Sequence, residues 1–272
     1  MATPSATMTS ASAMNRVLNM TRRCQRPRAC VKRLSPASWR YAAILAVALA
    51  VSATSAQQAL APTRILFIGN SLTYWNDGLW VHLERMAGRA TPPVALTTGR
   101  SVFPGAFFKS LWGRREPREA IRSRAYDVVV LQEDLPETRV EDFREHARRF
   151  VGEVRQAGAR PVLLMAWAYP RLGWITMAEI AAAHRAAAAE LKVDVAPVGL
   201  AWERARQQRA SLDLYAPDRE HPSVAGTYLT TAVVYAAVFG KDPMALEYVP
   251  TGISADDAAF LRRVAWAAVR EY

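Results

Sequence analysis

The chain has 272 residues, of which 51% are hydrophobic and 22% charged, and its formal net charge is +11. Eight of its 35 lysines and arginines lie in residues 1–56, which hold no acid, so residues 57–272 carry 27 basic side chains (35 minus 8) against 24 acidic ones. This near balance, without a concentrated basic patch, argues against nucleic acid as a partner. Both cysteines, Cys24 and Cys30, precede residue 57, which excludes disulfides, thiolate metal sites and a cysteine nucleophile from the rest.

Residues 1–56 have the pattern of an export signal. A basic region precedes a short apolar run over 41–51, and small residues follow up to Ala56. The run is shorter than the roughly 20 residues of a membrane span, so a retained N-terminal anchor is the alternative. We expect cleavage after Ala56, a periplasmic or secreted protein without stable membrane insertion, and a single domain over 57–272. The sequence leaves the oligomeric state open.

Short apolar runs alternate with helical segments through residues 57–272. Strands are expected at 65–68, 93–98, 126–131, 161–166 and 193–198. Helices are expected at about 79–86, 107–112, 140–156, 177–191, after 198, at 222–239 before Gly240, and from Ser254 onward. The alternation predicts an α/β fold with three α/β/α layers, namely a doubly wound parallel sheet of about five strands with helices on both faces.

Ser71 follows the first expected strand directly, after the pair Gly69-Asn70. It therefore lies on a tight strand-to-helix turn at the carboxyl edge of the sheet, where open α/β sheets bind ligands. A serine in such a turn has an exposed hydroxyl with backbone N–H groups nearby, which a nucleophile requires. A lone serine in a turn is more often only a turn residue, so the assignment needs a base.

The candidate base is His221, which stands three residues after Asp218 and just before a long apolar helix. Pro222 is expected as the first helical residue, with His221 at the cap. Asp218 would accept from one ring nitrogen of His221 and fix its tautomer, while the other nitrogen takes the proton of Ser71. A histidine that only caps the helix is the structural alternative.

Two more loops are expected at the same edge of the sheet. Gly99 begins a loop after the second strand, and Gln132 begins one after the third, so their donors can face one pocket with Ser71. Several aromatic side chains lie near these loops, and core packing is their default function, although rings beside a pocket would suit a sugar. They are Tyr74, Trp75, Trp167 and Tyr169.

Metal and cofactor sites are not expected. His82, His146 and His184 fall within expected helices without ligand spacing, which disfavours a zinc site. No glycine-rich phosphate loop follows a strand.

The segment Ile68-Gly-Asn-Ser-Leu-Thr73 resembles the first conserved block of the SGNH/GDSL hydrolase superfamily, and Asp218-Arg-Glu-His-Pro-Ser223 resembles the last. The blocks occur in the family's order across residues 57–272. The resemblance implies a flavodoxin-like three-layer fold and hydrolysis of esters through an acyl-serine intermediate, with Ser71, His221 and Asp218 as the catalytic residues.

The third block differs from the family's usual Gly-x-Asn-Asp, whose Asn donates to the oxyanion. This chain has Leu131-Gln-Glu-Asp134, which resembles a bacterial branch of the superfamily with Leu-Gln-Glu there. A glutamine amide can donate as asparagine does, so the expected oxyanion donors are the N–H groups of Ser71 and Gly99 and the side chain of Gln132. Gly105 and Asp134 are the alternatives at the last two positions.

Asn70 stands where the family more often has Asp, and its side chain is expected to hold the turn. With Tyr74 and Trp167 it makes up the expected substrate-binding set. The sequence thus predicts an exported serine esterase that removes small acyl groups from a carbohydrate or glycan ester. A glycan-binding protein of the same fold that lacks turnover is the alternative, and a flavodoxin-like nucleotide-binding protein is a weaker third.

Overall fold

The computed structural model describes residues 63–272, so the expected signal peptide and its cleavage site lie outside the described residues. Five parallel strands form one sheet in the order β2-β1-β3-β4-β5. They are β1 (Thr63–Gly69), β2 (Leu96–Val102), β3 (Val128–Glu133), β4 (Arg160–Met165) and β5 (Asp194–Ala196). The predicted doubly wound parallel sheet is confirmed.

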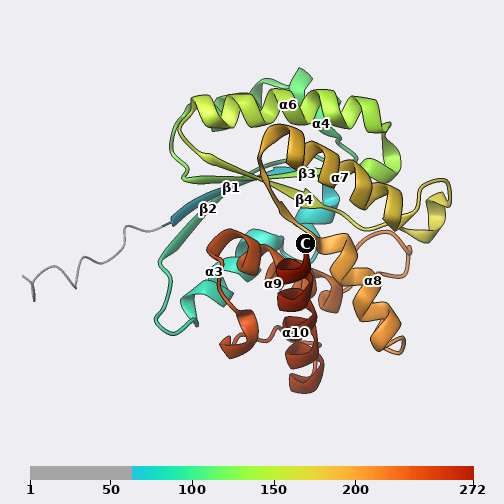
Figure 1. Ribbon diagram of the computed structural model, residues 1–272. Coiled ribbons are helices and arrows are strands. Elements are labelled where there is room, and N and C mark those ends of the chain that lie inside the picture. The colour runs from blue at the N-terminus through green and yellow to red at the C-terminus, as the bar shows by residue number, and fades with distance from the viewer. Residues whose placement is uncertain (1–62) are drawn as a thin grey trace, which may run out of the picture. The chain divides into compact units, whose positions relative to one another are not determined.

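Helices cover both faces of this sheet (Figure 1). One layer contains α4 (Phe108–Gly113), α5 (Arg115–Arg122), α6 (Val140–Gln156) and α7 (Met177–Leu191). The other contains α3 (Leu79–Gly88), α8 (Val198–Gln208), α9 (Val224–Phe239) and α10 (Ala255–Glu271). The short α2 (Ser71–Tyr74) follows β1, and 3-10 turns lie at Leu135–Glu137, Pro170–Leu172 and Pro243–Ala245. This is the three-layer α/β/α arrangement that the sequence predicts.

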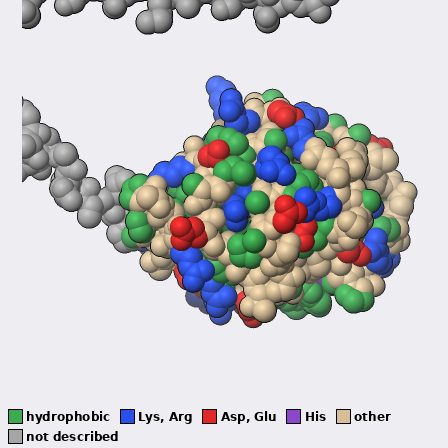
Figure 2. Space-filling model, turned by 90° about the horizontal axis from the view of Figure 1, so that it is seen from below, with side chains coloured by type: hydrophobic (Ala, Val, Ile, Leu, Met, Phe, Trp, Pro, Cys, Tyr) green, Lys and Arg blue, Asp and Glu red, His purple; other side chains and the backbone are tan. Residues whose placement is uncertain are grey.

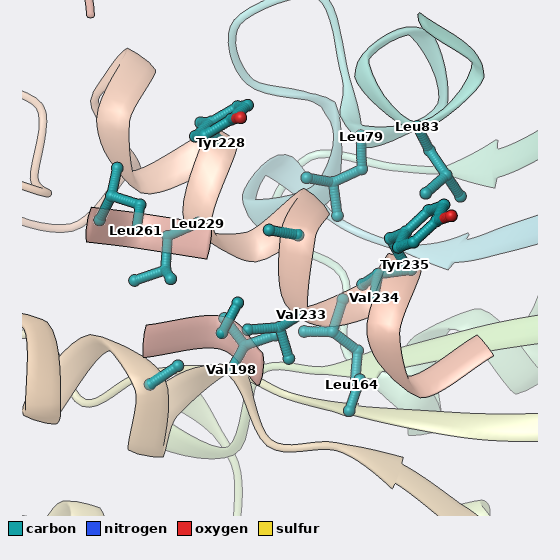
Figure 3. Close-up of a cluster of buried hydrophobic side chains, with 14 of the residues drawn as sticks. Leu79, Leu83, Leu164, Val198, Tyr228, Leu229, Val233, Val234, Tyr235 and Leu261 are labelled. Carbon is teal, nitrogen blue, oxygen red and sulfur yellow. The ribbon is translucent and has the colours of Figure 1, made fainter. Parts of the chain in front are cut away.

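The central strands are apolar on both faces because each face has its own helix layer. Along β1, Ile65 and Phe67 enter the core beneath α9, whereas Leu66 and Ile68 enter the core beneath α6. Figure 3 shows the first of these cores, in which α9 supplies side chains toward its neighbours on several sides. Its labelled residues are Leu79, Leu83, Leu164, Val198, Tyr228, Leu229, Val233, Val234, Tyr235 and Leu261. Because α9 is central and nearly all buried, it is a rigid support for the loop that precedes it.

Three element boundaries differ from the expected ones near the predicted site. Strand β2 runs to Val102, so Gly99 lies within it instead of starting a loop. Strand β3 runs to Glu133, so Gln132 is also a strand residue. Helix α9 begins at Val224, and its N-cap is Ser223, whose side chain accepts from the Gly226 N–H. The expectation that Pro222 opens this helix with His221 as cap is therefore wrong.

The surface seen in Figure 2 has basic and acidic side chains interspersed, without a large patch of one sign on that face. This agrees with the nearly balanced charge of residues 57–272. Between residues 63 and 272, no helix combines the length and apolarity needed to cross a membrane.

Two helical glycines should respond in opposite ways to substitution by alanine. A Cβ on Gly226 would lie 2.3 Å from the carbonyl oxygen of Leu214 and 2.7 Å from the Trp202 ring. Gly226→Ala should therefore lower the free energy of unfolding by about 1–3 kcal/mol through overpacking. A Cβ on Gly152, within α6, meets nothing within 4 Å, so Gly152→Ala should raise it by about 0.5–1 kcal/mol. Urea denaturation measures both, and shifts of the same sign would contradict the packing described.

Candidate active site

Ser71 occupies the first position of α2, directly after β1. The N-cap of this helix is Asn70, whose Oδ1 accepts from the Leu72 N–H at 3.0 Å, and whose carbonyl oxygen accepts from Thr73 Oγ1 at 2.7 Å. Ser71 is 9% exposed, at the carboxyl edge of the sheet where the sequence places it. The N–H of Ser71 is at a helix start, where backbone N–H groups have no partner within the helix.

Asn70 joins this turn to the ends of the two neighbouring strands. Its backbone N–H donates to Gln132 Oε1 at 2.8 Å. Its side-chain Nδ2 donates to Asp134 Oδ2 at 2.7 Å and to the Ala106 carbonyl at 3.0 Å. Asp134 follows β3 and Ala106 lies in the loop after β2, so the expected convergence of three strand ends is present.

The loop before α9 holds Asp218 and His221 as an ordered pair. Asp218 Oδ2 lies 2.8 Å from His221 Nδ1. Asp218 Oδ1 accepts from the backbone N–H groups of Glu220 at 3.0 Å and of His221 at 2.9 Å. Arg219, at φ 62°, makes the tight turn between them. Burial works to raise the pKa of Asp218, but the two backbone N–H groups and the imidazole outweigh it and hold this pKa below its ordinary value.

Two contacts bring the loop that holds Asp218 and His221 (the histidine loop) against the turn formed by Asn70 and Ser71 (the serine turn). The ring of Trp75, four residues after Ser71, stacks on His221 with the ring centres 4.0 Å apart and the planes at 17°. Asn76 Nδ2 donates to the Pro222 carbonyl at 2.9 Å and to Thr227 Oγ1 at 2.8 Å. The described hydrogen bonds include none between Ser71 Oγ and His221, a bond that often tightens only when substrate is bound.

Gly99 cannot serve as the expected oxyanion donor in a loop, because it pairs with Leu66 in the middle of β2. A Cβ there would lie 2.0 Å from the hydroxyl oxygen of Tyr126, so the glycine makes room for that ring. The alternative, Gly105, lies in the loop after β2 with φ 58° and is exposed. This loop contacts the serine turn, since Phe103 N–H donates to the Gly69 carbonyl at 3.0 Å.

Gln132 is fully buried, and its Oε1 braces the turn by accepting from the Asn70 N–H. Its Nε2 is also buried and has no partner among the described residues. The side chain packs against Gly69, where an added Cβ would lie 2.5 Å from Oε1. In this conformation Gln132 is a support of the turn, and its amide NH2 group is unused.

Two of the three expected substrate-binding residues are corrected by their burial. Asn70 is fully buried, with its side chain used inside the protein. Trp167 is 1% exposed and stacks on Trp202 with ring centres 3.8 Å apart, while its Nε1 donates to the Glu220 carbonyl at 3.0 Å. Trp167 therefore supports the histidine loop from the protein core through its bond to Glu220. Tyr74 is half-buried and stays a prediction.

The stacking of Trp75 on His221 is not predicted from the sequence. Trp75 is 36% exposed, and Trp174, in the loop after β4, is 57% exposed. The sequence does place Trp75 near the loops at the carboxyl edge of the sheet, four residues after Ser71. The contact itself joins residues 146 positions apart and has no local signal.

Two buried acids lie beneath the serine turn. Burial raises the pKa of Glu133 to about 8, although its carboxylate accepts from the N–H groups of Phe108 and Asp134. Burial also raises the pKa of Asp134 to about 6, against the opposing effect of hydrogen bonds from the Tyr169 hydroxyl and Asn70. Asp134 is buried, and its two carboxylate oxygens hold Asn70 and Tyr169.

One cluster of possible metal ligands occurs in residues 63–272, on α6 and away from the serine turn. It contains Asp142, Glu145 and His146. Its groups already have partners: Asp142 pairs with Lys109, Glu145 with Arg149, and His146 Nδ1 donates to the Asp142 carbonyl. We assign no metal site to it.

Asp134→Asn should change how stability depends on pH. The pKa of this carboxyl is about 6 in the folded state and 3.8 in its ordinary state, so its contribution to stability is complete below pH 4 and is lost as the pH rises through 6. Asparagine can accept from Asn70 and donate to Tyr169, so it keeps both bonds without titrating. Relative to wild type, the variant should gain up to about 3 kcal/mol between pH 4 and pH 7. Denaturation curves at both pH values measure this gain, and parallel changes in the two proteins would contradict it.

No protein-family profile and no curated protein matches the sequence. Solved structures do match. A candidate SGNH hydrolase from Slackia heliotrinireducens is 24% identical, with a TM-score of 0.55, and the match covers 65% of this chain and 100% of that one. A DUF4886 family protein from Bacteroides uniformis is 16% identical, with a TM-score of 0.66 and coverage of 77% and 95%.

A mutant of an acetyl-xylooligosaccharide esterase from Geobacillus is 17% identical, with a TM-score of 0.53 and coverage of 66% of this chain and 94% of that chain. At these identities the likeness is one of fold. The chain has the three-layer fold of the SGNH/GDSL hydrolase superfamily.

Proposed function

We propose that this protein is an exported serine esterase that acts through Ser71, His221 and Asp218. The observation that carries the proposal is the Asp218–His221 pair, joined at 2.8 Å and stacked against Trp75 beside the serine turn. The hydrolase and esterase folds among the solved structures support the reaction class. The export signal of residues 1–56 supports the location.

In the proposed reaction, His221 Nε2 takes the proton of Ser71 as Oγ attacks the ester carbonyl. Asp218 keeps a proton on Nδ1, so that Nε2 is free to accept, and it stabilises the imidazolium that forms. The tetrahedral intermediate then collapses, and His221 returns the proton to the departing alcohol. Water attacks the acyl-serine by the same route and releases the acid.

The negative oxygen of the intermediate needs donors at the serine turn. The N–H of Ser71 points from the start of α2, and the N–H of Gly105 is the candidate from the loop after β2. Gln132 holds the turn through Asn70, and its unused amide N–H is the candidate third donor. In this assignment Gly105 replaces Gly99.

Small acyl groups on a carbohydrate are the proposed substrate class. The exposed ring of Trp75 lies on His221, and the exposed ring of Trp174 lies in the loop after β4; rings of this kind can stack on sugar faces. A direct test compares hydrolysis of acetylated xylooligosaccharides, p-nitrophenyl acetate and p-nitrophenyl palmitate. The proposal expects turnover of the two acetyl esters and little of the palmitate. Binding of the oligosaccharide without turnover of any ester would instead establish the glycan-binding alternative.

Asp218→Asn should reduce kcat by about 10²–10⁴-fold, because an amide N–H facing Nδ1 favours the wrong histidine tautomer. The backbone N–H groups of Glu220 and His221 can still bond to the asparagine oxygen, so the loop should remain folded. Kinetics with p-nitrophenyl acetate measure the effect.

Asp213→Asn is the matched control, since Asp213 is an exposed acid of the same loop that pairs with Arg219. This control should leave kcat nearly unchanged. Equal rates for wild type and Asp218→Asn would remove Asp218 from the mechanism.

A further inference from the structure

A cavity of about 540 Å³ lies beside the histidine loop and is distinct from the serine turn. Its wall includes Asn76, next to the Trp75 that stacks on His221, and Val224, three residues after His221. The cavity and the proposed catalytic groups therefore share two short segments of chain. A molecule held in it would lie against both of these segments.

Two arginines supply the positive charge of this cavity. Arg85 is in the last turn of α3, and Arg89 follows four residues later at its C-cap, so both project from one side of the helix. No ion pair within residues 63–272 engages either guanidinium. The one acidic side chain on the wall is the exposed Asp77, which leaves a formal charge of +1.

Tyr248 holds both arginines near the cavity. The guanidinium carbon of Arg89 lies 5.6 Å from the centre of the Tyr248 ring. The nearby Tyr248 side chain raises the pKa of the Arg85 guanidinium above its ordinary value. The ring itself is 4% exposed and is fixed by the core. The arginines are thus arranged around a rigid support.

The floor of the cavity is neutral. His82 Nε2 lies 2.7 Å from the Asn76 carbonyl, which can only accept, so this nitrogen carries the proton. Nδ1 then accepts from the Tyr248 hydroxyl at 2.8 Å. Burial lowers the pKa of His82, with Arg85 acting in the same direction, so the ring remains uncharged. Selectivity for charge must therefore come from Arg85 and Arg89.

We propose that this cavity binds an oxyanion group, a carboxylate or a phosphate, carried by the substrate next to its ester. Guanidinium groups match the paired oxygens of both anions and bind them by charge-assisted hydrogen bonds. The hydroxyl of Thr251 on the wall is a further possible donor to such an anion. This proposal rests on the proposed esterase function. It narrows the substrate class to acidic carbohydrate esters.

The test measures binding to the Ser71→Ala protein, so that turnover plays no part. The probes are methyl glucuronide, the neutral methyl glucoside and glucose 6-phosphate. Titration calorimetry measures the dissociation constant of each. The proposal expects at least one acidic sugar to bind at least about tenfold more tightly than the glucoside. The stronger of the two acids identifies the anion as carboxylate or phosphate. Equal affinity for charged and neutral sugars would overturn the proposal.

A double variant, Arg85→Ala with Arg89→Ala, should lose that preference. Its control is Arg144→Ala with Arg148→Ala, a pair with the same spacing on α6, in the opposite layer, where both arginines meet Glu190. The control removes the same charge but should keep the preference, whereas an equal loss in both would overturn the proposal. Arginines in a last helical turn also favour the helix dipole, so Arg89→Gln is a milder second variant should the double one unfold.

Hydrolysis of p-nitrophenyl acetate separates this inference from the proposed function. The Arg85/Arg89 variant, with Ser71 intact, should hydrolyse this neutral ester at the wild-type rate. If the wild-type protein hydrolyses it but binds no acidic sugar preferentially, the cavity proposal fails and the esterase stands. If acidic sugars bind but no ester is hydrolysed, the esterase fails and the oxyanion cavity stands without a substrate ester.

Discussion

The buried hydrogen bonds of Asn70 hold the turn that carries Ser71 in place. One residue ties the end of β1 to Gln132 and Asp134 of the neighbouring strand end and to Ala106 of the loop beyond β2. A buried amide left without these partners would lower the free energy of unfolding by several kcal/mol. These bonds therefore keep the three segments together. These bonds also fix the position of Ser71, because it is the next residue along the chain. The turn is thereby rigid before any substrate arrives.

The histidine loop is built by a different means, with support from three sides. Asp218 orders the loop from within, Trp167 bonds to the Glu220 carbonyl from the core, and Trp75 covers the imidazole. Trp75 belongs to the segment that follows Ser71, so the two halves of the site meet through it. The next residues of this segment, Asn76 and Asp77, line the cavity that contains Arg85 and Arg89. Recognition of an acidic group and the proposed chemistry would then depend on one short stretch of chain.

Periodicity in the sequence predicts the layers and most elements, because burial of both sheet faces leaves a strong apolar signal. Helices α6 and α7 begin and end where that signal does. This periodic signal is missing where polar or small residues are buried because they contact residues distant in the sequence. Gly99 is expected in a loop but lies within β2, where its missing side chain leaves room for the Tyr126 ring. Gln132 is also expected in a loop but lies near the end of β3, where its Oε1 accepts from the Asn70 N–H. The stacking of Trp75 on His221 and the convergence of Arg85, Arg89 and Tyr248 join distant segments, so no local pattern announces them.

Covalent labelling by a fluorophosphonate determines whether Ser71 is an activated nucleophile, because the reagent traps a serine that a neighbouring base activates. The measurement is the intact mass of the purified protein, wild type beside Ser71→Ala and His221→Ala, with each shown to be folded by circular dichroism. We expect one adduct on wild type, located at Ser71 by peptide mapping, none on Ser71→Ala, and strongly slowed labelling of His221→Ala. A folded wild-type protein that stays unlabelled, or an adduct on another residue, would contradict this expectation.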